Sequence, residues 1–359
     1  MLLYKCKRLH SGERLNKFRP TFPSNICVFR GTKGMDITMK ANIYDIAEKA
    51  GVSTATVSRI INNSGKVSDV TKERVLAVMT ELNYYPSAFA RGMVTNSMKT
   101  IGVLAVDIRD TYYANVTYTI EQYLSENSYN VILCNTGNEL ESKKQYINML
   151  MSKKIDGLIL VGSVFKDKKL DDYIIKISKN LPVAIINGHI EGENVYCIMN
   201  DDKQGVCDAV SYLKKTGKTK IVFLKDTDSY SAEKKASGAV GYPVYRAEKG
   251  IDGGYNCIKL LLEDNKIING VVCSEDLIAV GVIKYLLEKG IKIPDDFSVI
   301  GFNNSVFSEC SSPQITSVDS NMTIIGREAA DTIIKVINKE KIDNKIILKS
   351  KLIKRGSTK

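Results

Sequence analysis

The sequence predicts a small all-α module followed by an α/β core that is built from two doubly wound subdomains. Residues 39–85 place apolar side chains at helical spacing, whereas the chain from Ile101 onward alternates short β-branched runs with amphipathic stretches. This alternation is typical of βαβ units with a mainly parallel sheet. At about 45 residues or fewer for each βαβ step, the second region is long enough for two such subdomains.

Short apolar runs are the predicted strands of this core, and amphipathic stretches between them are the predicted helices. Strands are expected at residues 101–107, 131–135, 157–162, 183–187, 220–225, 270–274 and 297–302. Helices are expected at residues 114–128, 139–153, 203–216 and 276–289, among others. Because ligands of open α/β sheets bind beyond the carboxyl ends of the strands, the loops that follow these strands are the candidate ligand site.

The net charge of +11 is concentrated near the start of the 359-residue chain. Residues 1–38 hold 8 basic and 2 acidic side chains, and residues 39–99 hold 8 and 5. The rest of the chain is almost balanced, with 35 basic and 33 acidic side chains. A polyanionic partner is therefore expected to meet the first quarter of the chain.

Several classes of protein are disfavoured by the composition. No apolar run approaches the roughly 18 to 20 residues of a membrane span, and the N-terminus does not read as a secretion signal. The eight cysteines form no C-x-x-C pair, and the only histidines are His10 and His189, so neither a metal nor a cofactor is expected. Phosphate-loop, nucleophile-elbow and dinucleotide-binding motifs are also absent. We therefore expect a cytosolic protein that is not an enzyme and has no membrane partner.

A helix-turn-helix is predicted at the start of the all-α module. Residues 43–50 carry one apolar helical face, Gly51 can take the positive φ that ends this helix, and Ser53 is a strong N-cap for a second helix. Two short helices joined by a turn of about three residues that contains glycine form this motif. A third helix, capped by Ser68 or Asp69, is expected to close the small core.

The second of these helices is the candidate DNA-reading element, because in this motif its N-terminal half enters the major groove. Its outward residues are expected to be Thr54, Ala55, Ser58 and Arg59, and a guanidinium can grip the O6 and N7 atoms of guanine. The alternative is that Arg59 is a solvated helix residue and that the hydroxyls serve only as caps. The glycine turn and the charge bias together favour DNA binding.

The same residues carry a resemblance to a known family. The run I-Y-D-I-A-x-x-A-G-V-S-x-x-T-V-S-R-I-I-N-N at residues 43–63, followed by T-K-E-R-V at 71–75 and E-L-N-Y-Y-P at 81–86, resembles the DNA-binding headpiece of the lactose and galactose repressor (LacI/GalR) family of bacterial transcription regulators. The resemblance implies a homodimer on a palindromic, double-stranded DNA operator, in the cytoplasm and on the nucleoid when bound. The DNA-binding residues that it implies in the headpiece are Asn42, Ser53, Thr54, Ala55, Thr56, Ser58, Arg59, Asn62 and Ser68.

The resemblance also gives roles to the segments on either side of the headpiece. Residues 86–99 match a hinge helix and linker, where Ala90, Arg91 and Met93 would lie in the minor groove and Met93 would be the apolar wedge that is usually Leu. The alternative for Met93 is an ordinary linker residue. Residues 1–38 have no helical or strand period and are expected to be a disordered extension, read from an early start codon ahead of Met39 or serving as a basic arm on DNA.

From residue 100 the chain is similar to the effector core of the family and to periplasmic sugar-binding proteins. The resemblance implies an N-subdomain at about 100–198 plus 315–335, with the C-subdomain as the remainder of 100–359, and a sugar or related metabolite as the effector. Three cleft positions depart from the usual residues: Lys235 stands for Arg, Glu275 for Asn and Asn303 for Asp. The segment 238–246 is about a dozen residues shorter than usual. The implied effector contacts, each of which could instead be an ordinary loop residue, are Asp107, Tyr112, Tyr113, Asn187, Lys235, Glu275 and Asn303.

The sequence thus predicts a DNA-binding transcriptional regulator, and a repressor in particular, that is controlled by a small effector. The alternative is a cytosolic sugar- or nucleoside-binding protein in which DNA binding is vestigial. The headpiece joined to the core and the lack of an export signal favour the regulator.

Overall fold

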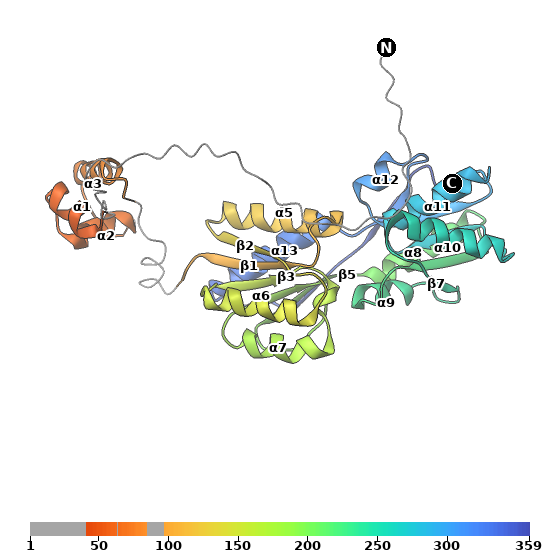
Figure 1. The fold of residues 1–359 in the computed structure, drawn as a ribbon, viewed down its shortest axis with the longest axis horizontal. Helices are drawn as coiled ribbons and strands as arrows, with labels where there is room; N and C mark the ends of the chain where they lie inside the picture. The colour runs from red at the N-terminus through yellow and green to blue at the C-terminus, as the bar shows by residue number, and fades with distance from the viewer. Residues whose placement is uncertain (1–40, 63, 85–96) are drawn as a thin grey trace, which may run out of the picture. The chain divides into compact units, whose positions relative to one another are not determined.

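The structure is a computed structural model that describes residues 41–62, 64–84 and 97–359. It has two compact units, residues 1–85 and 86–359, which we call the headpiece and the core (Figure 1). The predicted extension 1–38 lies outside the described residues, and so do the hinge positions Ala90, Arg91 and Met93.

The headpiece is the predicted three-helix module. Its helices are α1 (Ile43–Ala50), α2 (Thr54–Ile61) and α3 (Asp69–Glu81). Gly51 ends α1 with φ of 63°, and Ser53 caps α2 by accepting a hydrogen bond from the backbone N–H of Thr56 at 3.2 Å. The helices enclose one small apolar core of Ile46, Ala47, Ala50, Val57, Ile60, Val75 and Val78. The helix-turn-helix prediction is confirmed.

The first sheet of the core has six parallel strands with helices on both faces (Figure 1). Its strand order is β11 (Lys345–Leu348), β5 (Val195–Asn200), β4 (Val183–Ile186), β3 (Gly157–Leu160), β1 (Thr100–Ala105) and β2 (Asn130–Asn135). One face packs on α5 (Thr111–Glu126) and α13 (Met322–Ile337), and the other on α6 (Leu140–Ser152) and α7 (Lys168–Ser178), with the 3-10 turn η1 (Ser163–Phe165) after β3. These elements form the N-subdomain.

The second sheet has the same plan except for one antiparallel edge strand. Its order is β12 (Lys351–Ile353), β10 (Thr316–Asp319), β9 (Ser298–Asn303), β8 (Gly270–Cys273), β6 (Ile221–Lys225) and β7 (Val244–Arg246). One face packs on α8 (Asp202–Lys215) and the turn after α9 (Tyr230–Ala236), and the other on α10 (Gly250–Glu263) and α11 (Asp276–Glu288), while α12 (Val306–Cys310) follows β9. These elements form the C-subdomain, and the core has the predicted fold of two doubly wound subdomains.

The chain crosses between the two subdomains three times. It leaves the first sheet after β5, returns after β10 to form α13 and β11, and leaves again to form β12. The three crossing segments lie against one another, because Asp201 donates its backbone N–H to Leu348 at 2.9 Å and Asn200 donates its side-chain amide to the carbonyl of Ser320 at 2.7 Å. The subdomains are therefore joined by three chain segments that run side by side as a single bundle.

Two buried asparagines hold this bundle together. The amide of Asn321 donates to the side-chain oxygen of Asn200 and to the carbonyl of Lys349, both at 3.0 Å. The backbone N–H of Asn200 donates to the side chain of Asn187 at 3.0 Å. Asn200 and Asn321 are only 7% and 8% exposed, so each of these hydrogen bonds is shielded from water. We call Asn200 and Asn321 the asparagine clamp.

The structure differs from the predicted subdomain boundaries. Residues 316–319 form β10 in the second sheet, whereas the sequence placed 315–335 in the N-subdomain. The return to the first sheet instead comprises α13 and β11, and the first segment runs to the end of β5 rather than to residue 198. The prediction was wrong here because Thr316 and Ser317 are polar yet fully buried, so β10 has no apolar pattern to reveal it.

Several strands were not predicted, for related reasons. Strands β7 and β12 have three residues each, and β11 has exposed residues alternating with half-buried ones at the sheet edge. The shortened segment between α9 and β7 contains only turns, so no helix stands there.

The asparagine clamp predicts a specific loss of stability. Replacing Asn200 by Ala removes its side-chain bonds and leaves the buried carbonyl of Ser320 without its donor, which we expect to lower the free energy of unfolding by about 1–3 kcal/mol. Urea unfolding followed by circular dichroism measures the change as a lower midpoint. Asn344→Ala, at an exposed side chain on the same return segment, is the matched control and should leave the midpoint unchanged. Equal midpoints for both variants would contradict the role of the clamp.

Candidate functional site

The outward face of α2 presents the side chains that the sequence predicted for reading DNA. Ala55 and Arg59 are exposed, and Thr54 and Ser58 are partly exposed. Asn62, which follows the helix, donates its amide to the hydroxyl of Ser58 at 3.3 Å. These five residues therefore lie on or beside one accessible face, as an element that enters the major groove requires.

Arg59 is the cation on this face. Its guanidinium makes no ion pair with the part of the chain that the structure describes, and its aliphatic stem lies beside Gly65. A Cβ at Gly65, which has φ of 78°, would stand 3.4 Å from the Cδ atom of Arg59. The stem is thus packed while the charged end remains available for an external acceptor.

The other predicted headpiece residues act as helix caps in this structure. Asn42 accepts hydrogen bonds from two backbone N–H groups at the start of α1, and Ser68 accepts one from the first turn of α3. Thr56 lies with its hydroxyl 3.0 Å from that of Ser53, which caps α2. Hydroxyl and amide groups at helix N-termini can both cap the helix and face a phosphate, so the two roles are compatible.

An exposed aromatic side chain was missed by the sequence reasoning. Tyr44 lies on α1 with 71% of its surface exposed, although aromatic residues in a small core module are normally packed. The sequence could have indicated this exposure, because Tyr44 falls outside the apolar face of residues 43–50.

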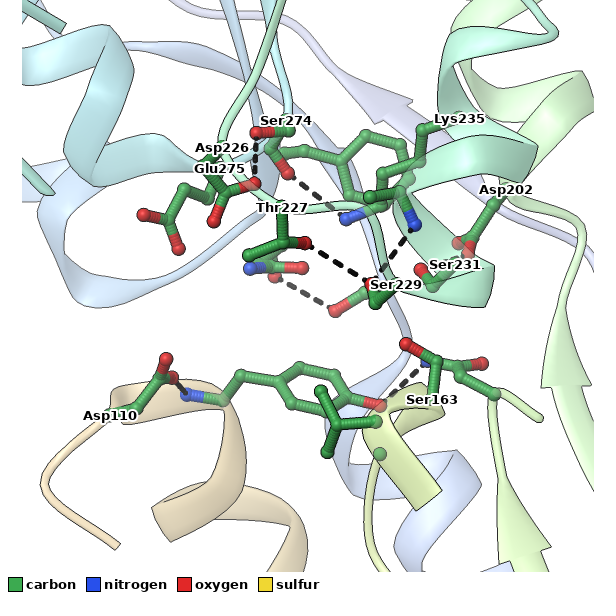
Figure 2. Close-up of a pocket in the computed structure, with 18 of the residues that line it drawn as sticks. Asp110, Ser163, Asp202, Asp226, Thr227, Ser229, Ser231, Lys235, Ser274 and Glu275 are labelled. Carbon is green, nitrogen blue, oxygen red and sulfur yellow. Dashed lines mark hydrogen bonds between the residues drawn. The ribbon is translucent and has the colours of Figure 1, made fainter. Parts of the chain in front are cut away.

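The core contains a polar pocket between its two subdomains (Figure 2). It lies beyond the carboxyl ends of the strands, where the loops after β1 and β3 face those after β6 and β8. In each sheet the strand order reverses at one of these strands. In the first sheet it is β1, which lies between β2 and β3, and in the second it is β6, which lies between β7 and β8. Ligands of open α/β sheets bind at such points.

Six of the seven predicted effector residues line this pocket, and one does not. The six are Tyr112, Tyr113, Asn187, Lys235, Glu275 and Asn303. Asp107 is not among the lining residues, because its carboxylate pairs with the guanidinium of Arg109 at 2.8 Å. That hydrogen-bonded pair lowers the pKa of Asp107 to about 2.

Tyrosines from α5 form the wall on the N-subdomain side. The hydroxyl of Tyr112 accepts a hydrogen bond from the amide of Asn187 at 2.8 Å, and Asn187 in turn accepts from the backbone of Asn200. The ring of Tyr113 lies against Gly162, where an added Cβ would stand 2.6 Å from the ring. Gly162 also has φ of 108°, so this position favours glycine on both counts. Burial raises the pKa of both tyrosines, so their hydroxyls stay neutral.

Lys235 reaches into the pocket from α9 but already has partners. Its ammonium donates to the carbonyl of Ser274 at 3.0 Å and stands 3.8 Å from the centre of the Phe302 ring. The residue is 9% exposed. The lysine thus supplies a positive charge beside Asp202, with one of its three N–H donors already used by Ser274.

Four carboxylates line the pocket, of which the sequence reasoning named only Glu275. The others are Asp110 at the N-cap of α5, Asp202 at the start of α8 and Asp226 directly after β6. Burial, together with the charges of Asp226 and Asp110, raises the pKa of Glu275 to about 7. Burial also raises the pKa values of Asp110 and Asp202. An acidic residue directly after a predicted strand was the signal that could have found Asp226.

Two other kinds of site are not found in the described ranges. None of their helices has the length and apolar character that a membrane span needs. Their His, Cys, Asp and Glu side chains form no group of three or more that could hold a metal ion.

Comparisons with known proteins agree with this arrangement. The family described as "Bacterial regulatory proteins, lacI family" matches residues 42–87, and that described as "Periplasmic binding proteins and sugar binding domain of LacI family" matches residues 98–355. An HTH-type transcriptional regulator of Lachnoclostridium phytofermentans is 39% identical over 330 residues, which cover 88% of this chain and 99% of that protein. The HTH-type transcriptional repressor PurR of Histophilus somni is 31% identical over 325 residues, which cover 86% and 95%.

A solved structure shows the same fold. The lac repressor dimer bound to operator and the anti-inducer ONPF superposes with a TM-score of 0.82 at 23% identity, covering 89% of this chain and 99% of that one. The relatives are transcriptional regulators rather than enzymes. The chain therefore belongs to the LacI family of bacterial regulatory proteins, and it is a DNA-binding transcriptional regulator.

Proposed function

We propose that the protein is a repressor that binds a palindromic operator as a homodimer, with an affinity for the operator that a small, sugar-like effector controls. The observation that carries the proposal is that one chain joins a helix-turn-helix with an accessible Arg59 to a polar pocket lined by both subdomains of the core. The 31% identity to a protein named as a repressor supports repression rather than activation.

Reading of the operator is assigned to α2. Arg59 offers two parallel N–H donors to a guanine, Ala55 offers a methyl contact, and the hydroxyls of Thr54 and Ser58 can serve either as donors or as acceptors. The caps formed by Asn42, Ser53 and Ser68 would position the helix ends on the backbone phosphates. From the family resemblance, Ala90, Arg91 and Met93 would enter the minor groove between the two half-sites.

A two-fold dimer follows from the size of the reading surface. One α2 helix covers one half-site, so a palindrome read by two headpieces doubles the specific contact. The core offers apolar side chains for such an interface: Tyr118 on α5 is 66% exposed, Leu133 on the edge strand β2 is 43% exposed, and Leu260 on α10 is 61% exposed.

The pocket is connected to the crossings between the subdomains. A ligand that contacts Tyr112 or Asn187 acts on a chain of hydrogen bonds that continues through Asn187 to Asn200 in the asparagine clamp. A change of angle between the subdomains would alter the spacing of the two hinges in a dimer. Such coupling between an effector and a second site is typically worth about 1–3 kcal/mol.

Arg59→Ala tests the readout by α2. We expect the variant to lose about 1–3 kcal/mol of binding free energy on a duplex selected from a random pool by the native protein, and to lose its preference at one base position of each half-site. Fluorescence anisotropy and a repeated selection measure the two effects. Arg74→Ala removes the same charge from the exposed face of α3 and should keep the sequence preference. An unchanged preference in the Arg59 variant would refute the assignment.

Met93→Ala tests the minor-groove wedge. Truncation removes the apolar group that would hold open a base step, so the affinity for the selected duplex should fall by at least tenfold while that for a scrambled duplex hardly changes. Met93→Leu keeps the apolar volume and should retain nearly native binding. Equal losses on both duplexes, measured by filter binding, would show that Met93 has no such role.

A further inference from the structure

The pocket has more acidic than basic side chains. Four carboxylates line it, against the two ammonium groups of Lys235 and Lys249. No lysine or arginine nitrogen among the described residues lies within 4.0 Å of any of the four carboxylates. Carboxylates taken out of water without a cationic partner are unfavourable, so a pocket with this lining favours a ligand that brings positive charge.

Neither lysine forms an ion pair at the acidic end of the pocket, although the charges of both lower the pKa of Glu275 and that of Lys249 lowers the pKa of Asp110. Lys235 donates to the carbonyl of Ser274 and lies over the ring of Phe302, and its charge also lowers the pKa of Asp202. Lys249 precedes α10 and is exposed to solvent. Its charge is therefore screened by water.

Asp226 and Glu275 lie side by side at the opposite end from Asp202, and Asp110 lies across the pocket from them (Figure 2). Asp226 accepts one hydrogen bond from the hydroxyl of Ser274 at 2.7 Å, and Asp110 accepts one from the backbone N–H of Tyr112 at 2.8 Å. The carboxylate of Glu275 accepts none from the described residues. The charges of Asp226 and Asp110 both raise the pKa of Glu275, so this carboxylate is repelled by the other two. A protonated amine between them would offer three N–H donors and remove that repulsion.

An unpartnered atom at the other end points independently to a bound ligand. Oδ2 of Asp202 accepts a hydrogen bond from the hydroxyl of Ser231 at 2.5 Å, whereas Oδ1 is buried and has no partner. Asp202 is 4% exposed and lines the pocket. A buried carboxylate oxygen normally has a donor, and a ligand hydroxyl would supply it.

The remaining lining identifies the body of the ligand as a polyol ring. Ser163, Thr227 and Ser229 place hydroxyls along the pocket (Figure 2), and Asn303 adds an amide to its lining. Aromatic rings such as Tyr113 provide apolar surface against which the C–H face of a sugar ring packs.

From these observations we propose that the effector is an amino sugar, whose protonated amine is held by Asp110, Asp226 and Glu275 and whose hydroxyls reach Asp202 and the neighbouring serines. This inference rests on the proposed function, because it names the ligand of the same pocket.

Calorimetric titration of the full chain at neutral pH tests the ligand class with sets of sugars that differ in one group. Each set compares an amine with its hydroxyl and N-acetyl counterparts, as in D-glucosamine, D-glucose and N-acetyl-D-glucosamine, and is repeated for the galactose and mannose series. We expect at least one amine to bind about tenfold or more tightly than both of its neutral counterparts, because charge-assisted hydrogen bonds are the stronger ones.

Glu275→Gln assigns the preference to the acidic end of the pocket. The amide is nearly the same size but has no negative charge, so the advantage of the amine over the hydroxyl should shrink to about threefold or less. Glu263→Gln makes the same change at an exposed position on α10, outside the pocket, and should keep the full advantage. Thermal unfolding of both variants checks that the core remains folded.

The outcomes separate this inference from the proposed function. A neutral sugar that binds as tightly as its amine, or no binding of any amine at millimolar concentration, overturns the ligand class. A persistent preference for the amine in the Glu275 variant overturns the assigned residues. An amine that binds with the expected preference but leaves the affinity for the selected duplex unchanged supports the ligand class and contradicts effector control.

Discussion

The asparagine clamp is the constraint on which the rest of the core depends. Three separate crossings of the chain must run together if the first sheet is to receive α13 and β11 and the second sheet is to receive β12. Asn200 and Asn321 satisfy the backbone carbonyls of Ser320 and Lys349 in these crossings, which the backbone N–H groups of the crossings do not reach. Because Asn187 touches both the clamp and Tyr112, the pocket and the junction of the subdomains share one network.

The pocket lies where the loops after β1 and β6, the strands at which the order of each sheet reverses, face each other. This position explains why acidic side chains line it. Loops at the ends of parallel strands bring helix N-termini and their capping residues together, which explains the carboxylates of Asp110 and Asp202. Side chains that start helices in this way are only partly satisfied by the helix. They are therefore free to recognise a ligand, at the cost of the raised pKa values that burial imposes.

Sequence patterns correctly predicted the elements that depend on interactions between neighbouring residues. The period of the headpiece, the turn at Gly51 and the cap at Ser53 gave both helices of the DNA-reading motif, and the loops after the predicted strands contained most of the pocket. The strand β10 was missed because the buried hydroxyl of Ser317 donates to Asp276 at 2.6 Å and accepts from the backbone N–H of Asn304 at 3.0 Å, two partners outside the strand. The family resemblance assigned Asp107 to the pocket, yet its carboxylate pairs with Arg109. The partners of Ser317 appear only once the fold is known, whereas Asp107 and Arg109 are only two residues apart.

The order of the crossings has a consequence for synthesis of the protein. The apolar layer between the first sheet and its helices includes Ile325 and Ile333 of α13, which the ribosome makes only after the strands β6 to β10 of the second sheet. The N-subdomain therefore cannot complete its packing while it is the newest part of the chain. The headpiece core, by contrast, is contiguous between Ile46 and Val78 and needs nothing made later. During translation the DNA-reading module is thus ready before the part of the protein that would control it.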